Sequence, residues 1–276
     1  ITTTAQKYTG KDTRKQQNKE VTMAIGDSTR VNTNIAAFNA LNSLKNVNRN
    51  LEISQLRLAT GLRINEVADD PAGFTISKRL DARARGLVVA LDNVGTAKNV
   101  LSIAEGGLLN IQNILITMKE KVTQAASDTL GTAERDAIKT EIDQLTAEIN
   151  DIVSETTFND IALIDGTYQN KSYQTGEDTT NTMIFSISDN NSATGLGVDS
   201  SVVSTKLTSA ADASGALAAV DTAIGTIADT LQNIGATIAR MTFKESTLRI
   251  SVTNTQSTKS RILDADIANE QLSSTR

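Results

Sequence analysis

The stretch GLRINEVADDPAGFTISKRL, residues 61–80, holds the only proline of the chain, Pro71, directly after Asp69 and Asp70. It separates two long segments in which apolar residues recur every three or four positions. Aspartate is a preferred N-cap, proline is a preferred first helical residue, and negative charge is favourable at a helix N-terminus. A metal or acid–base site would need further acids or a histidine, and this stretch supplies only Glu66. We therefore interpret Asp70 and Pro71 as a helix start.

Upstream of this stretch, apolar residues alternate at spacings of four and three positions, which is the pattern of a coiled-coil seam. Two polar residues, Asn48 and Gln55, interrupt the seam. We predict an N-terminal coiled-coil helix over residues 23–62, which Gly61 terminates. The seam residues are Leu41, Leu44, Leu51 and Leu58.

Downstream of Pro71, three more segments repeat this spacing, and they predict helices over about residues 71–126, 138–152 and 217–262. A helix of some 50 residues is about 75 Å long, whereas an average globular helix has about 11 to 12 residues. The seam of the first of these helices includes Leu101, Leu108, Ile111 and Leu115, and that of the last includes Ile227, Leu231, Ile234, Ile238, Met241 and Leu248.

Two glycines, Gly106 and Gly107, lie within the second predicted helix. Two glycines inside an exposed helix would cost about 2 kcal/mol together. We therefore expect another helix or subunit to come close to the backbone there.

Residues 165–210 differ from the rest, because they are rich in Thr, Ser, Asn, Asp and Gly. Asp165-Gly166 is a turn signal, and MIFSIS at 183–188 alternates as a strand does.

The predicted fold class is mainly α: an elongated antiparallel bundle of long coiled-coil helices with a small β-containing cap. Residues 41–62 are expected to lie against residues 227–248. The predicted parts are a flexible extension (1–22), the N-terminal coiled-coil helix (23–62), long helices of a rod domain (63–164), a small β- and loop-rich outer segment (165–210) and a C-terminal long helix (211–276).

The composition of the 276-residue chain excludes several function classes, because it has no Cys and no His. These absences rule out a Ser-His-Asp triad, a Cys-His pair and thiolate metal sites. We expect no enzyme, no cofactor and no metal. The net charge of −5 argues against nucleic-acid binding. No run of 18 apolar residues occurs, so we expect no membrane span, and residues 1–22 lack the apolar core of a signal peptide.

A basic stripe at Lys78, Arg79, Arg83 and Arg85 remains open to two interpretations. It is either a solvated or intersubunit helix face, or a site for an anionic polymer. The second interpretation gives an alternative function, a cell-surface adhesin or receptor for an anionic polysaccharide.

Several motifs in one order resemble those of bacterial flagellins. They are MAIGDSTRVNTNIAAFNALNSL from Met23, TGLRINEVADDPAGFTISKRL, VLSIAEGGLLNIQNIL, TTFNDIALIDG and TNTQSTKSRILDADIANE. The resemblance covers about residues 23–165 and 210–270. It implies a short flagellin that lacks large outer domains.

This resemblance implies a structural subunit of the flagellar filament that self-assembles through its N- and C-terminal coiled-coil helices for swimming motility. The implied partners are other flagellin subunits, a flagellar export chaperone and cap proteins. The implied location is extracellular, on the flagellum or cell surface, with export that needs no cleaved signal peptide.

Three departures from the family pattern stand out. Residues 1–22 precede the usual start at Met23, so they are expected to be an upstream or artificial addition. The family's terminal helical segment after the DADIANE motif is expected to be absent. In the segment that a vertebrate innate receptor reads in many flagellins, Thr117 replaces a frequent Arg and Lys121 replaces a frequent Leu, which implies weak receptor activation.

Overall fold

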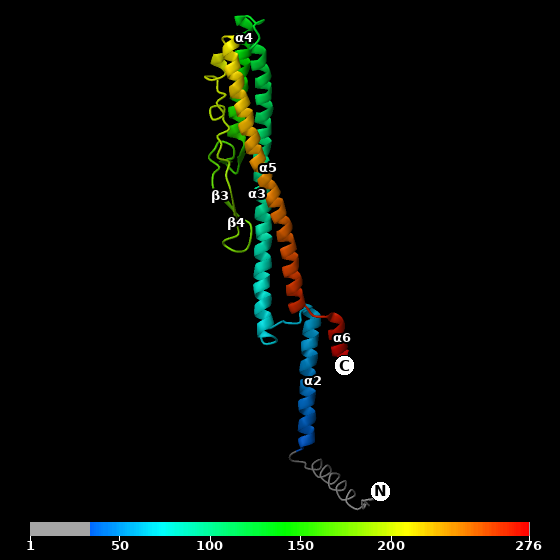
Figure 1. Cartoon of the computed structure of the whole chain (residues 1–276). Coiled ribbons are helices and arrows are strands. Elements are labelled where there is room, and N and C mark those ends of the chain that lie inside the picture. Colours follow the sequence, from blue (N-terminus) through cyan, green and yellow to red (C-terminus); the bar gives the residue numbers. More distant parts are fainter. Residues whose placement is uncertain (1–33, 276) are drawn as a thin grey trace, which may run out of the picture. The chain divides into compact units, whose positions relative to one another are not determined.

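The structure, a computed structural model, describes residues 34–275, in which helices predominate and strands are short (Figure 1). The predicted extension over 1–22 and the start of the 23–62 helix lie outside these residues. The helices are α2 (Ile35–Thr60), α3 (Pro71–Ala125), α4 (Thr132–Glu155), α5 (Ala210–Leu263) and α6 (Ile267–Thr275), and the strands are β1 (Thr157–Phe158), β2 (Ile161–Ala162), β3 (Lys171–Gln174) and β4 (Thr182–Phe185).

The described chain divides into two compact units. The first, which we call the terminal unit, comprises residues 34–77 and 260–275. The second, the bundle unit, comprises residues 78–259. Most of α3, all of α4 and most of α5 belong to the bundle unit, whereas α2 and α6 belong to the terminal unit.

In the bundle unit α3 and α5 run antiparallel, as three ion pairs show. Asp81, near the start of α3, pairs with Lys259, and Lys119, near the end of α3, pairs with Asp221, with Lys98–Glu245 between them. The helix α4 is antiparallel to α3 as well, because its end at Thr156 approaches Gly107 while Glu141 pairs with Lys121. These three helices confirm the predicted antiparallel bundle.

The core of the bundle unit is formed by the faces that carry the predicted seams. The seam residues Leu101, Leu108, Ile111 and Leu115 of α3 are fully buried. On α5, Leu231 and Ile238 are partly buried against this core, and the fully or almost fully buried seam residues are Ile227, Ile234, Met241 and Leu248. The α5 seam is therefore covered within the bundle unit, which contains no part of α2. The expectation that residues 41–62 lie against residues 227–248 stays a prediction, because a periodic pattern shows that a face is buried but not against which helix.

The outer segment after α4 packs along the helices instead of capping their ends (Figure 1). Its apolar residues join the bundle core, including Leu163, Ile164, Ile187 and Val198. Strands β3 and β4 pair antiparallel, with Lys171 opposite Phe185. The predicted strand at 183–188 is therefore partly confirmed, since β4 covers Thr182–Phe185. The first hairpin, β1–β2, precedes the predicted segment and turns at Asn159 and Asp160, which have positive φ.

The C-terminal region contains two helices where one was expected. The helix α5 ends at Leu263. The side chain of Asp266 then accepts hydrogen bonds from the backbone N–H groups of Ala268 (3.0 Å) and Asn269 (3.3 Å) and so caps the start of α6. An Asp in this position stabilises a new helix start.

By length and composition α3 could cross a membrane, since it contains an 18-residue window of mean hydropathy 1.3. The expectation of no membrane span rested on the absence of an unbroken apolar run, and α3 passes the looser test of helix length and mean hydropathy. Core helices pass the same test, and here 39% of the window is buried inside the structure. We attribute the apolar character of α3 to its place in the bundle core.

Candidate assembly surfaces

The aspartates before α3 have separate structural roles, and Asp70 has the predicted one. Asp70 Oδ1 accepts a hydrogen bond from the backbone N–H of Gly73 at 2.9 Å, so it caps the helix that begins at Pro71. A Cβ at Gly73 would clash with Asp70 Oδ2 and would lie 2.8 Å from Ile64 Cδ1. The absence of a side chain at Gly73 therefore makes room for the cap and for the buried Ile64.

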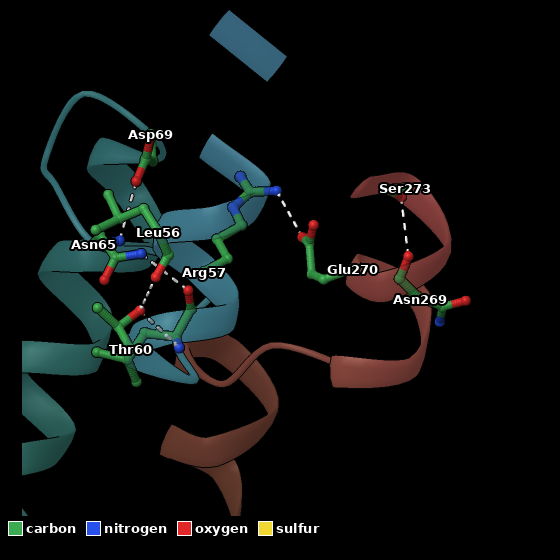
Figure 2. Close-up of polar contacts among 9 residues, drawn as sticks. Leu56, Arg57, Thr60, Asn65, Asp69, Asn269, Glu270 and Ser273 are labelled. Carbon is green, nitrogen blue, oxygen red and sulfur yellow. Dashed lines mark hydrogen bonds and ion pairs between the residues drawn. The ribbon is translucent and has the colours of Figure 1, made fainter. Parts of the chain in front are cut away.

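Asp69 holds the connector before α3 (Figure 2). Its Oδ2 accepts hydrogen bonds from the backbone N–H groups of Asn65 (3.0 Å) and Glu66 (3.1 Å). These hydrogen bonds lower the pKa of the Asp69 carboxyl below its ordinary value, and the bond from Glu66 has the largest effect. Both acids thus stabilise backbone, and among the described residues no group of three or more acidic, His or Cys side chains could hold a metal ion.

The helix α2 presents an unusually apolar exposed surface, which we call the α2 face. Ser54 is the only buried residue of this helix. Leu58 is half-buried, whereas the other predicted seam residues, Leu41, Leu44 and Leu51, are exposed. The remaining exposed large apolar side chains of the helix are Ile35, Phe38, Val47 and Leu56. A helix with this much uncovered apolar surface is typical of a protein–protein contact.

The C-terminal end of α2 is fixed to the segment that follows α5. Gly61 adopts φ 70° and ends the helix, and its carbonyl accepts a hydrogen bond from the N–H of Ala265 at 2.9 Å. Arg57 Nη1 donates to Glu270 Oε1 of α6 at 3.0 Å (Figure 2). Segments about 200 positions apart in sequence thereby meet in the terminal unit.

Two ion-pair networks link α3 and α5 in the bundle unit. Lys259 Nζ lies 2.6 Å from Asp81 Oδ1, and Lys98 Nζ lies 2.9 Å from Glu245 Oε2. The hydrogen bond from Lys259 is the main cause of the lowered pKa of Asp81. Hydrogen bonds from Arg249 and then Lys98 lower the pKa of Glu245. The networks fix the register of the two helices.

The basic stripe of α3 lies in the bundle unit with all four cations exposed: Lys78, Arg79, Arg83 and Arg85. Arg83 Nε lies 2.8 Å from Glu177 Oε1 in the turn after β3, and Arg85 Nε lies 3.0 Å from Asp81 Oδ2. These contacts place the stripe beside the β3–β4 hairpin. Asn93 Nδ2 of α3 also contacts this hairpin, because it donates a hydrogen bond to the backbone carbonyl oxygen of Gln174 at 3.4 Å.

The segment that departs from the family pattern is engaged within the bundle. Lys121 Nζ pairs with Glu141 Oε1 of α4 at 2.7 Å. The hydroxyl of Thr117 donates to the carbonyl of Asn113 at 3.1 Å. The cation at position 121 thus holds α4 to α3, and the effect of these residues on receptor binding stays a prediction.

Sequence reasoning missed the contacts of the terminal unit. The Arg57–Glu270 pair has no local signal, because it joins two segments that are distant in sequence. The cap at Asp266 does have a local sequence signal, since Asp before a helix-forming run is a helix-start pattern.

The described residues form a mainly helical protein that exposes large apolar side chains on α2 and charged side chains on α3 and α4. Comparison with known proteins identifies the family. The profile of the bacterial flagellin N-terminal helical region matches residues 31–169. This match spans half of the chain, so the chain belongs to the bacterial flagellin family.

Named relatives agree with this assignment. The chain is 37% identical to polar flagellin B/D of Vibrio parahaemolyticus over 159 residues, which are 58% of this chain and 42% of that protein. It is 36% identical to flagellin B of Vibrio anguillarum over 164 residues, 59% of this chain and 44% of that protein. The matched region is thus less than half the length of these relatives.

A solved structure supports the fold alone. A putative flagellar hook-associated protein from Vibrio parahaemolyticus matches with a TM-score of 0.59 at 15% identity, over 71% of this chain and 100% of that chain. The mainly helical architecture with a small β region is therefore a known one.

Proposed function

We propose that this chain is a structural subunit of the bacterial flagellar filament and contributes to swimming motility by self-assembly. Its membership of the flagellin family carries the proposal. The role is structural and not catalytic, since the chain offers no His or Cys for the usual nucleophilic chemistry.

The α2 face supplies the physical reason for assembly. Phe38, Leu44 and Val47 are 62%, 57% and 61% exposed. Covering such side chains with neighbouring subunits contributes about 25 cal/mol per Å² of apolar surface removed from water. Assembly through helices near the two chain ends gives this surface a partner.

The partners proposed for this function are other flagellin subunits, an export chaperone and filament cap proteins. The proposed location is the extracellular flagellum, reached without a cleaved signal peptide. The alternative, an adhesin for an anionic polysaccharide, gains no support from the comparisons.

Co-assembly in a flagellated bacterium tests the proposal. We would express the chain beside the host flagellin and detect it on isolated filaments by immunogold electron microscopy. The chain is expected along the filaments. The double variant Leu41→Asp/Leu44→Asp is expected to be absent from them, because it places charge on the α2 face.

The matched control is Asn42→Asp/Asn46→Asp, which adds the same charge at two exposed polar positions of α2. It should incorporate as the unchanged chain does. Filaments free of the unchanged chain, although it is exported, would contradict the proposed function.

A further inference from the structure

The helix α5 carries a stripe that combines exposed apolar side chains with free cations, and we call it the α5 stripe. Phe243 and Ile250 are 75% and 59% exposed, and their spacing of seven positions places them on one side of the helix. Arg240 neighbours Phe243 on the helix surface, since it lies three positions earlier. Lys244 lies four positions after Arg240, and neither cation makes an ion pair within the described chain. These four residues form the α5 stripe.

A stripe of opposite charge lies on α3, and we call it the α3 stripe. Leu109 and Ile116 are each 44% exposed and are also seven positions apart. Glu105 lies four positions before Leu109. Glu120 lies four positions after Ile116, so the four residues of the stripe share one side of the helix. Neither glutamate makes an ion pair within residues 34–275.

The α5 stripe has two unfavourable features in a single copy. The side chain of Phe243 is 75% exposed, although the burial of aromatic rings contributes strongly to the stability of interfaces. Arg240 and Lys244 are like charges at i,i+4, and such a pair destabilises an isolated helix. A partner that presents both apolar side chains and carboxylates would relieve both features.

The two stripes do not cover each other within one copy. The Lys98–Glu245 ion pair sets the register, so Phe243, two positions before Glu245, is level with about residue 100 of the antiparallel α3. Leu109 lies about nine positions further along α3, a rise of about 14 Å. Ile250 is farther still from Leu109, because it lies toward the opposite end of α3. Apolar side chains are in contact when their heavy atoms approach within about 4.5 Å, so the α3 stripe of the same copy cannot cover the α5 stripe.

We infer that the α5 stripe of one copy docks onto the α3 stripe of a second copy. The apolar pair of one stripe then packs on the apolar pair of the other, since both pairs have the same spacing of seven positions. The two cations of the α5 stripe face the two carboxylates of the α3 stripe. This inference rests on the proposed function and specifies one of its contacts.

A second copy is the favoured occupant because the chain itself displays the surface that matches in charge and in apolar spacing. Complementary charge also orients the incoming copy and suppresses wrong pairings. An anionic polymer would pair with the cations of the α5 stripe but would leave its apolar side chains, and the whole of the α3 stripe, without a partner.

Cross-linking tests the contact, and the absence of native cysteine makes it specific. Asn113 lies between the two apolar residues of the α3 stripe and Ser246 between those of the α5 stripe, and both are exposed. We would mix the Asn113→Cys and Ser246→Cys proteins, add a short bismaleimide, and separate the products on a denaturing gel. The same reaction is run on free protein and on filaments that contain both variants. The control pairs the Ser246→Cys protein with Ala137→Cys, an exposed position of α4.

The mixed dimer is expected to exceed either homodimer and the control dimer by on the order of tenfold. Introducing Phe243→Asp into the Ser246→Cys protein should lower its yield by a similar factor, because a carboxylate then stands in the apolar centre of the contact. Since Phe243 is exposed in a single copy, this variant should keep the circular dichroism spectrum and the Tm of the unchanged chain.

Charge reversal tests the polar part of the contact. Introducing Arg240→Glu/Lys244→Glu into the Ser246→Cys protein should lower the yield of the mixed dimer, because like charges then face each other. Introducing Glu105→Lys/Glu120→Lys into the Asn113→Cys protein as well should restore it, which excludes misfolding as the cause.

Absence of the mixed dimer from both preparations, a yield no higher than that of the control pair, or a yield that Phe243→Asp leaves unchanged would overturn the inference. Occupation of the α5 stripe by another partner would appear as a loss of yield that charge restoration on α3 does not recover, and would overturn it too. Immunogold incorporation of the unchanged chain is scored separately, so a failed docking contact is distinguishable from a failed proposed function.

Discussion

Two adjacent glycines of α3 are explained by different surroundings. A Cβ at Gly107 would lie 2.6 Å from Thr156 Oγ1 and 3.3 Å from Ile164 Cδ1. At Gly106 a Cβ would meet nothing within 4 Å. The sequence-based expectation of a close approach is therefore confirmed at Gly107, where the approaching group belongs to the same chain.

We predict opposite effects of alanine at these two positions. Gly107→Ala should lower the free energy of unfolding, by roughly 1 to 3 kcal/mol, because the end of α4 must shift to admit the methyl group. Gly106→Ala should raise it by about 1 kcal/mol, because alanine favours the helix and finds open space. Chemical denaturation followed by circular dichroism measures both. Equal effects would contradict the assigned close approach.

At the scale of elements, the register between α3 and α5 depends on ion pairs as well as on the apolar seam. Asp81 and Glu245 are held in the charged form by Lys259, Lys98 and Arg249. Their pKa values are lowered from ordinary values of 3.8 and 4.5. A carboxylate with a lowered pKa stabilises the folded state above its unfolded pKa, and this contribution is lost as the pH falls through the folded pKa.

We therefore predict that Tm falls as the pH drops below about 4.5, and that Glu245→Gln makes this fall shallower. At neutral pH the variant should have the lower Tm, because it has lost the stabilising charge. Asp136→Asn is the control, since it removes an exposed carboxylate of α4 outside both networks. Thermal unfolding followed by circular dichroism measures the Tm of the unchanged chain and of both variants across this pH range. A pH dependence unchanged in Glu245→Gln would refute the role of the pair.

A third prediction concerns the contact between α2 and α6. Glu270→Ala should expose the α6 amides to faster hydrogen exchange, because Arg57 loses its partly buried partner at a cost of about 1 kcal/mol. Gln271→Ala, its exposed neighbour, serves as the control. Hydrogen exchange measured by mass spectrometry over residues 267–275 reports the difference. Protection that is the same in both variants would show that the pair does not hold α6.

Long elements were predictable from the sequence, and short or distant contacts were not. The helix predicted at 71–126 is α3, because one proline and one aspartate mark its start and a sustained apolar period marks its length. The side-on packing of residues 165–210 escaped prediction, since it depends on tertiary pairs such as Thr230–Asp189. The break before α6 had a local signal in Asp266, which the apolar period alone does not reveal. The α2 seam stays a prediction, because periodicity does not reveal whether its cover comes from the same copy or another.

For the whole molecule, the departures at Thr117 and Lys121 bear on host recognition. We predict weak activation of the vertebrate innate receptor that reads this segment in many flagellins. The double variant Thr117→Arg/Lys121→Leu should raise the response, because a hot-spot pair contributes about 2 kcal/mol or more to binding.

Reporter cells that express the receptor measure this response against dose. The control Lys139→Leu removes a cation from α4 instead and should leave the response weak. Full activation by the unchanged chain would contradict the prediction.

The central claim is that neighbouring copies cover the surfaces that one copy leaves exposed. Electron cryomicroscopy of filaments that contain this chain tests it most directly. The account predicts density from adjacent subunits against Phe38, Leu41 and Leu44 of α2. A filament in which these side chains face open solvent would contradict the account.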